Sequence, residues 1–215
     1  MGGKKVWVAS VSMLLGMLAV SPAWGLEVTG GPTLTMDPNG VTPLAGLIDL
    51  ETDVPTRVTL TVSDGTDTWS NQFRAFQTVH AVQVLGLKAD RAYALELTLT
   101  DEFGVSVVVS PQLNAVTPPL PADFPIITVY HSEPLRMEPG FTLMDRFRRF
   151  GGPGAEYSII VDNVGDVVWF STAAGQDGQV QLPNGRLLQL DSSEVDLLGN
   201  TFEFRVLDVP GLFLH

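Results

Sequence analysis

The sequence predicts an all-β protein in which a β-sandwich is followed by the first blades of a β-propeller. Two observations support this prediction. Between Leu26 and Thr117, apolar and polar residues alternate with a period of two, which is typical of half-buried strands. Between residues 126 and 215, short apolar runs are separated by Asp-x-x-Gly and Asn-Gly turns, which are hairpin signals. We therefore divide the chain into residues 1–25, 26–117, 118–125 and 126–215.

The first 25 residues have the pattern of a secretory signal peptide. Two lysines precede the apolar run Val6–Val20, which is too short for a comfortable membrane span. Ala23 and Gly25 then supply the small residues of a cleavage site. We expect cleavage after Gly25, export to the periplasm or beyond the cell, and no membrane contact afterwards. An uncleaved anchor helix is the alternative.

Residues 26–117 are predicted to form a sandwich of the fibronectin III or Ig-like type, with two sheets. Alternation is clearest in Arg57–Ser63 and in Tyr93–Thr100, and Asp64-Gly65 follows the first run as a hairpin turn. The stretch Val84–Tyr93 resembles fibronectin type III domains, because a leucine and a polar turn precede a tyrosine that opens the next strand. In such domains the tyrosine hydroxyl bonds to nearby backbone.

Residues 118–125 are predicted to be a stiff, extended linker, because Thr117–Pro125 holds four prolines in nine residues. After it, Val161-Asp-Asn-Val-Gly165 recurs 34 residues later as Val195-Asp-Leu-Leu-Gly199, with Leu182-Pro-Asn-Gly185 between them. A closed propeller needs about four or more blades. Residues 126–215 have room for roughly two, so the sequence predicts the opening part of a larger protein.

Composition excludes several classes of function. The net charge of −12 argues against nucleic acid and anionic membrane surfaces as partners. The absence of cysteine excludes disulfides, zinc thiolate sites and cysteine nucleophiles. Asp162, Asn163 and Asp166 lack the alternating carboxylates of a calcium loop, so we interpret them as a turn and expect no metal site. Arg146, Arg148 and Arg149 suit either an anion site or a solvated strand edge.

The three histidines do not form a recognisable catalytic group. His80 shares strand parity with Val82 and Val84, which predicts packing at the sandwich edge. His131 follows the linker and suits a surface or a domain interface. No serine lies in the turn that a serine-hydrolase nucleophile needs.

Four runs in order resemble the start of the bacterial arylsulfotransferase family, whose members are exported aryl-sulfate sulfotransferases. These runs are Arg136–Leu143, Tyr157–Trp169, Leu182–Leu188 and Glu194–Asn200. The resemblance covers about Met137–His215 by motif and the sandwich by architecture. It implies a sandwich followed by a six-bladed propeller.

The same resemblance implies transfer of a sulfuryl group from an aryl sulfate donor to a phenolic acceptor through a sulfo-histidine. It implies no cofactor, and it also allows a homodimer. His215 stands where the family has the start of a histidine pair, while the family's carrier histidine lies further along. We therefore expect this chain to be truncated and inactive alone. The alternative is an exported, non-enzymatic sandwich and propeller module that binds a carbohydrate or a protein.

Overall fold

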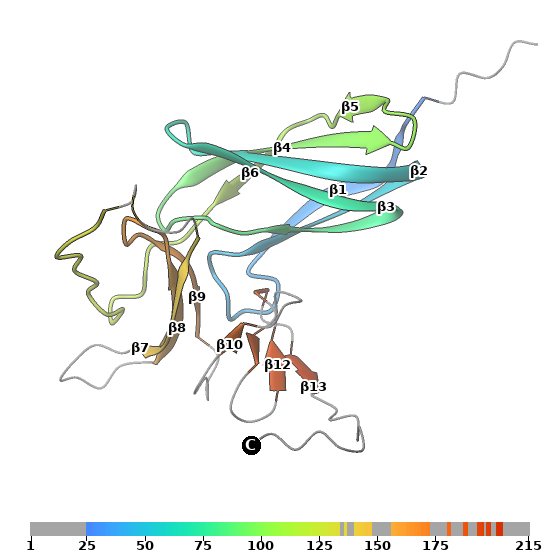
Figure 1. The fold of residues 1–215 in the computed structure, drawn as a ribbon. Helices are drawn as coiled ribbons and strands as arrows, with labels where there is room; N and C mark the ends of the chain where they lie inside the picture. The colour runs from blue at the N-terminus through green and yellow to red at the C-terminus, as the bar shows by residue number, and fades with distance from the viewer. Residues whose placement is uncertain are drawn as a thin grey trace, which may run out of the picture.

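The computed structural model of the chain describes residues 25–133, 136, 140–147, 156–172, 180–181, 187–188, 193–195, 197–198 and 201–203. These residues form an all-β structure with three antiparallel sheets and no α-helix (Figure 1). In the described ranges, no helix has the length and hydropathy that crossing a bilayer requires. The all-β prediction is therefore confirmed.

The first sheet contains six strands: β1 (Val28–Met36), β2 (Gly46–Ser63), β3 (Thr68–Val84), β4 (Ala92–Asp101), β5 (Ser106–Val108) and β6 (Leu113–Val116). The long strand β2 pairs with β3 along most of its length. On its other edge, β2 pairs first with β1 and then, from Thr56, with β4. β4 in turn pairs with β5 and β6. The prediction of two separate sheets was wrong. Because β2 pairs with β1 and then with β4 along the same edge, all six strands belong to one curled sheet.

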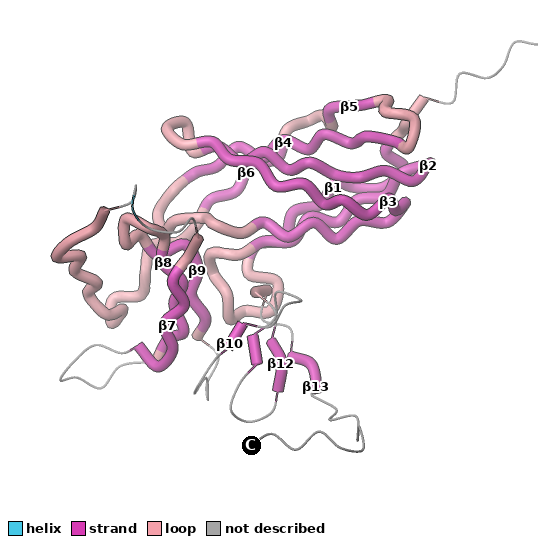
Figure 2. The backbone as a smooth tube through the Cα atoms, in the orientation of Figure 1, coloured by secondary structure: helices cyan, strands magenta, loops and turns pink. Residues whose placement is uncertain are grey.

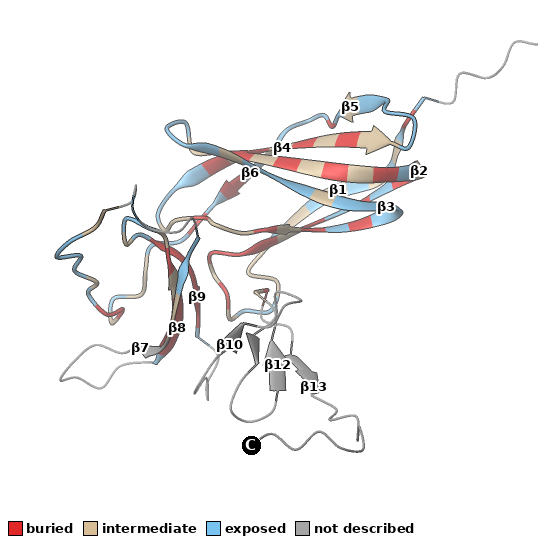
Figure 3. Cartoon of the chain, in the orientation of Figure 1, coloured by how far each residue is buried: buried red, intermediate tan, exposed pale blue. Residues whose placement is uncertain are grey.

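The inner face of the curled sheet holds the main hydrophobic core. Alternate residues of β2 and β4 are buried, including Val58, Leu60, Leu97 and Leu99, which are each at most 2% exposed. Figure 3 shows this alternation as stripes along the strands. Burying each large apolar side chain contributes about 1.5–3 kcal/mol, so this face supplies most of the driving force for the first domain.

The predicted tyrosine contact is present at the start of β4. The Tyr93 hydroxyl accepts a hydrogen bond from the Lys88 backbone N–H at 2.7 Å. The Tyr93 ring meets the edge of Trp69 with ring centroids 5.9 Å apart. The hydroxyl therefore satisfies a loop amide while the ring fills the core, which fixes the loop between β3 and β4.

Two smaller sheets follow the first domain. One contains β7 (Thr142–Phe147), β8 (Tyr157–Val161) and β9 (Val167–Ser171) in sequential order. The other contains β10 (Val180–Gln181), β11 (Leu187–Leu188), β12 (Ser193–Val195) and β13 (Thr201–Glu203), also in sequential order. Such meanders agree with the predicted hairpins, whereas the propeller itself stays a prediction.

The predicted linker is not an extended spacer. Figure 2 shows residues 118–125 as a loop without a strand. The Phe124 N–H donates to the Pro121 carbonyl at 2.9 Å, which bends the segment back. Phe124 is only 7% exposed and Leu120 packs beside it. The prolines restrict the backbone of this segment. Burial of Leu120 and Phe124 nevertheless holds the segment against the protein through the hydrophobic effect.

Candidate functional site

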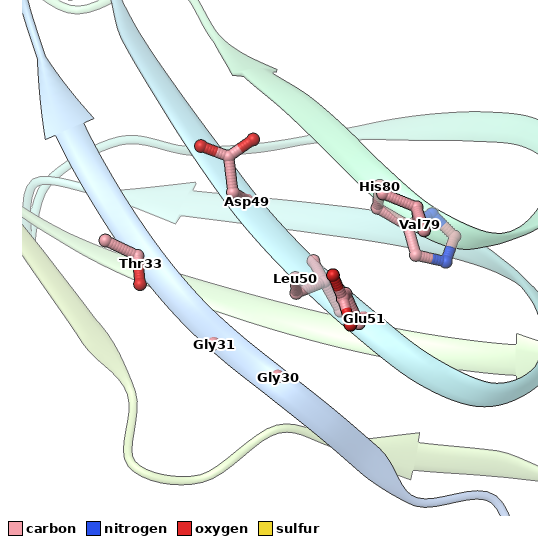
Figure 4. A pocket seen from close by; sticks show the side chains of 8 residues that line it. All are labelled: Gly30, Gly31, Thr33, Asp49, Leu50, Glu51, Val79 and His80. Atoms are coloured by element: carbon pink, nitrogen blue, oxygen red, sulfur yellow. The ribbon is translucent and has the colours of Figure 1, made fainter.

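The first candidate is a cavity of about 360 Å³ on the first domain, lined by residues of β1, β2 and β3 (Figure 4). Its lining residues are Gly30, Gly31, Thr33, Asp49, Leu50, Glu51, Val79 and His80. A bulge in β1 shapes it, since the pairing of β1 with β2 shifts register between Gly30 and Thr33. Gly31 has φ +75°, and an added Cβ there would lie 2.5 Å from the Asp49 carbonyl oxygen.

The titratable groups around this cavity lie on opposite faces of the sheet. Asp49 and Glu51 are exposed on the outer face, whereas Leu50 and its cross-strand partner His80 are buried. The His80 Nε2 lies 2.9 Å from the Thr56 hydroxyl. Burial lowers the pKa of His80, although a hydrogen bond that its ring donates to the backbone of Gln77 raises it. His80 is therefore neutral and is buried together with Val82 and Val84, whose strand parity it shares, although the sequence placed it at the sandwich edge. It cannot act together with the carboxylates, which lie on the opposite face.

The other predicted chemical residues do not gather into a site. His131 is exposed, and its Nε2 contacts the Glu133 carboxylate at 3.0 Å. His215, Arg148 and Arg149 lie outside the described residues, as does the side chain of Arg146. Among the residues that the structure describes, no cluster of three or more histidines and carboxylates could hold a metal ion.

The junction between the first domain and the β7–β9 sheet is the best-developed polar arrangement in the described structure. The Lys88 ammonium lies 3.1 Å from the Asp162 carboxylate and 2.6 Å from the Asp166 carboxylate. The other oxygen of Asp162 accepts the backbone N–H groups of Val164 and Asp166. One carboxylate thus shapes the β8–β9 turn and also holds it against the first domain.

The environment of Lys88 keeps it charged. Partial burial by itself would lower the pKa of Lys88, but hydrogen bonds to Asp166 and Asp162 outweigh it and raise the pKa. The backbone of Lys88 is equally constrained, because its N–H donates to Tyr93 and its carbonyl accepts from the Thr117 hydroxyl at 2.6 Å. These hydrogen bonds therefore hold in place the β3–β4 loop that carries the Lys88 ammonium.

A hydrophobic cluster, which we call the junction core, lies beside this ion pair. It joins Leu44 of the first domain and Phe124 of the proline-rich segment to residues of β8 and β9. The full set is Leu44, Phe124, Tyr157, Ile159, Val161, Val167 and Phe170. The Tyr157 hydroxyl donates to Asp123 at 2.8 Å, and burial together with this carboxylate raises its pKa to about 12.

The second repeated turn also contacts the first domain. The Leu198 carbonyl accepts hydrogen bonds from the Asn39 amide at 2.9 Å and from the Thr42 hydroxyl at 3.1 Å. The Trp169 indole N–H donates to the Leu197 carbonyl at 2.7 Å. The first repeated turn therefore contacts the loop that joins β3 to β4, and the second contacts the loop that joins β1 to β2.

Sequence reasoning missed these anchoring residues. The only available signal was that Lys88 is the single lysine after Lys5 in an acidic chain. Its partners lie far along the sequence, and nothing local to Leu87-Lys88-Ala89 points to them. Among the described residues around the Lys88 ion pairs, no nucleophile lies beside a base. We therefore interpret them as a structural contact that positions the β7–β9 sheet against the first domain.

Comparison with known proteins identifies the first domain. Residues 33–118 match the family model of the arylsulfotransferase Ig-like domain. The match begins inside β1 and ends just after β6, so it spans the curled sheet and stops at the proline-rich segment. The comparison with curated proteins gave no match. Residues 33–118 of this chain therefore belong to the arylsulfotransferase Ig-like domain family.

Proposed function

We propose that this chain is the N-terminal portion of an exported aryl-sulfate sulfotransferase. The single observation that carries the proposal is the match of residues 33–118 to the arylsulfotransferase Ig-like domain. The antiparallel hairpins that follow and pack against that domain also support it, since they suit the first blades of the propeller that the sequence predicts.

In the proposed reaction, a sulfuryl group moves from an aryl sulfate to a histidine and then to a phenolic acceptor. A neutral imidazole can attack sulfur and carry the group covalently, which replaces one difficult step by two easier ones. Developing negative charge on the sulfuryl oxygens requires cationic or N–H donors aimed at them. His80 is unsuited to this role, because it is buried and bonded to Thr56. The resemblance assigns the start of a histidine pair to His215.

The Ig-like domain has a positioning role in this proposal. Catalysis by groups from several blades requires each blade to be held within about 0.5 Å of its working position. Lys88 and the junction core attach the β8–β9 hairpin to the domain through charge and apolar contact. The domain therefore serves as a rigid base for the first blade.

Export is part of the proposal. It rests on the signal pattern of residues 1–25, with cleavage after Gly25. N-terminal sequencing of protein from the native host should give Leu26 as the first residue. A chain that still begins at Met1 in the cytoplasm would exclude export.

The experiment for the activity uses the longer gene product that the resemblance implies, purified from its native host. It is supplied with phenyl sulfate as donor and a second phenol as acceptor, without any nucleotide sulfate. We expect sulfated acceptor and released phenol in equal amounts, with ping-pong kinetics. If no transfer occurs, the protein is instead an exported, non-enzymatic module that binds a carbohydrate or a protein.

A further inference from the structure

Two arginines of the first domain have no carboxylate partner. Residues 26–117 contain four cationic side chains, Arg57, Arg74, Lys88 and Arg91. Lys88 and Arg91 are paired with carboxylates, whereas in the described part of the chain no carboxylate lies within ion-pair distance of Arg57 or Arg74. These two guanidinium charges are therefore not neutralised by the described residues.

A bulge in β3 brings the two arginines together. The register of β2 and β3 shifts here, so that Arg57 alone faces residues 74–76 of β3. Val58 is buried, so the neighbouring Arg57 projects from the outer face of the sheet. Phe73 packs against the inner core, so Arg74 projects from the same outer face. Bulges re-aim side chains in this way, and they are frequent next to functional sites.

The Arg57 guanidinium carries a buried donor that has no acceptor. Its Cζ lies 5.8 Å from the centre of the Phe76 ring, and Phe76 is 40% exposed. The Arg57 Nε is buried and makes no hydrogen bond with the described residues. An unsatisfied buried N–H is costly and uncommon in native proteins, and a bound ion is one of its ordinary explanations. An acceptor from outside the chain would satisfy this donor.

The charges around the bulge also call for an anion. Arg57 and Arg74 are like charges at facing positions of paired strands, which destabilises a sheet. On the other side of Arg57, its partner in β4 is Thr100, whose hydroxyl lies 2.9 Å from the Ser106 hydroxyl. Hydroxyls can donate to an anion but carry no charge that neutralises the arginines. A bound anion would supply both the missing charge and the missing acceptor.

The acidic balance of the chain opposes an anion only weakly here. Glu96 lies four residues from Thr100 along β4, or about 13 Å, which exceeds the screening distance of about 8 Å at physiological ionic strength. Asp101 accepts the N–H groups of the turn after β4. Glu102, in the same turn, is exposed, where water and salt screen its charge most strongly.

We propose that the outer face of the first domain binds a doubly charged oxyanion, phosphate or sulfate, between Arg57 and Arg74. Guanidinium groups bind such oxygens through paired N–H donors, and two positive charges favour a dianion over a singly charged carboxylate. No histidine belongs to this site, because His80 lies on the inner face. The proposal goes beyond the function proposed above, and it stands or falls independently of sulfuryl transfer.

Titration calorimetry on the full chain tests the site, with sodium phosphate, sodium sulfate and sodium acetate compared at equal ionic strength. We expect one dianion to bind and acetate to bind more weakly. Arg57→Gln should raise the Kd about tenfold or more, since it removes charged hydrogen bonds, and Arg74→Gln should raise it several-fold. Arg136→Gln, at an 81% exposed arginine outside the site, is the matched control and should leave the Kd unchanged.

Two further measurements separate binding from folding. The Arg57 Nε–H signal in proton–nitrogen spectra, identified by its loss in Arg57→Lys, should shift when phosphate or sulfate is added. The Arg136 signal should not shift. Glu102→Gln should bind the dianion more tightly than the unmodified chain, because it removes the nearest exposed negative charge.

The lower Kd of the two dianions identifies which one the site prefers, and either order supports the proposal. If Arg57→Gln does not fold, Arg74→Gln decides, since its side chain is exposed. No binding by the unmodified chain, or equal binding by the unmodified chain and Arg74→Gln, would overturn the proposal. Acetate that binds as tightly as phosphate and sulfate would overturn the assignment to a dianion.

Discussion

At the scale of single residues, Lys88 links the Ig-like domain to the next sheet. Its ammonium contacts two carboxylates, and the Lys88 and Asp162 side chains are only 21% and 16% exposed. Removing the ammonium would leave the carboxylates of Asp162 and Asp166 facing each other without a counter-charge. The effect should therefore exceed that of an ordinary surface ion pair.

We predict that Lys88→Met lowers the free energy of unfolding by about 1.5–3 kcal/mol, the range for hydrogen bonds to charged groups. Urea denaturation at neutral pH measures it. Arg136→Met is the matched control, since Arg136 is 81% exposed in its pair with Glu133, and it should cost less than about 1 kcal/mol. If the two substitutions lower the free energy of unfolding by the same amount, the Lys88 ion pairs contribute no more to stability than an exposed surface ion pair does.

Asp64 gives a prediction about acid stability. The backbone N–H groups of Asp67 and Thr66 lower the pKa of Asp64 to about 2, and the Arg91 guanidinium adds to this. Because the folded pKa is below the ordinary value of 3.8, the charged form stabilises the fold above pH 3.8. This contribution is lost as the pH falls through about 2.

We therefore predict that Asp64→Asn is less stable than the unmodified chain at pH 5 and above, and that the difference shrinks between pH 4 and pH 2. Thermal unfolding at a series of pH values measures it. A difference that stays constant down to pH 2 would mean that the Asp64 charge does not contribute.

At the scale of elements, the β1 bulge depends on one glycine. Gly31 has φ +75° and an added Cβ would clash with the Asp49 carbonyl, whereas Gly40 has φ +70° and nothing within 4 Å. Gly40→Ala therefore measures backbone strain alone, at about 1–2 kcal/mol. Gly31→Ala should cost more than Gly40→Ala, because β1 must also move away from β2. Denaturation midpoints compare them, and equal costs would contradict the clash.

The sequence predicted the elements better than their connections. Alternation correctly placed the buried faces of β2 and β4, and the Asp-x-x-Gly pattern correctly placed the β8–β9 turn at Asp162–Gly165. Alternation did not predict that one edge of β2 pairs first with β1 and then with β4. Alternation shows which side of a strand is buried, but it carries no information about which strand lies next to it.

At the scale of the whole molecule, the junction core connects three parts of the chain. Phe124 sits between them, with ring centroids 4.9 Å from Tyr157 and 5.3 Å from Phe170. The proline-rich sequence alone suggested a spacer, because proline content reports backbone stiffness and not the packing of Leu120 and Phe124. The ion pairs of Lys88 could not be predicted from the sequence either, since Asp162 and Asp166 lie in a hairpin far along the chain.

We predict that Phe124→Ala lowers the free energy of unfolding by about 3–5 kcal/mol, the range for a buried aromatic residue. It should also make the segment between the two domains sensitive to limited proteolysis. Phe103→Ala is the control, since Phe103 is 92% exposed, and it should change stability by less than about 0.5 kcal/mol. Unchanged protease resistance in Phe124→Ala would show that the junction core does not hold the parts together.

The family match and the motifs that carry the sequence resemblance lie on different parts of the chain. Motifs suggested the family from residues 137–215, and the family model matches residues 33–118. The Ig-like domain is thus established independently of those motifs. The predicted catalytic residue His215 lies outside the described residues, so its role remains part of the proposal.

The most direct test of the central claim is to trap the sulfuryl group on the enzyme. The longer gene product that the resemblance implies is purified from the native host and incubated with an aryl sulfate and no acceptor, and its peptides are analysed by mass spectrometry. We predict a burst of phenol equal to the enzyme present and one sulfuryl group on a histidine other than His80, removed when a phenolic acceptor is added. Release of phenol without any modified histidine, or no release at all, would contradict the account.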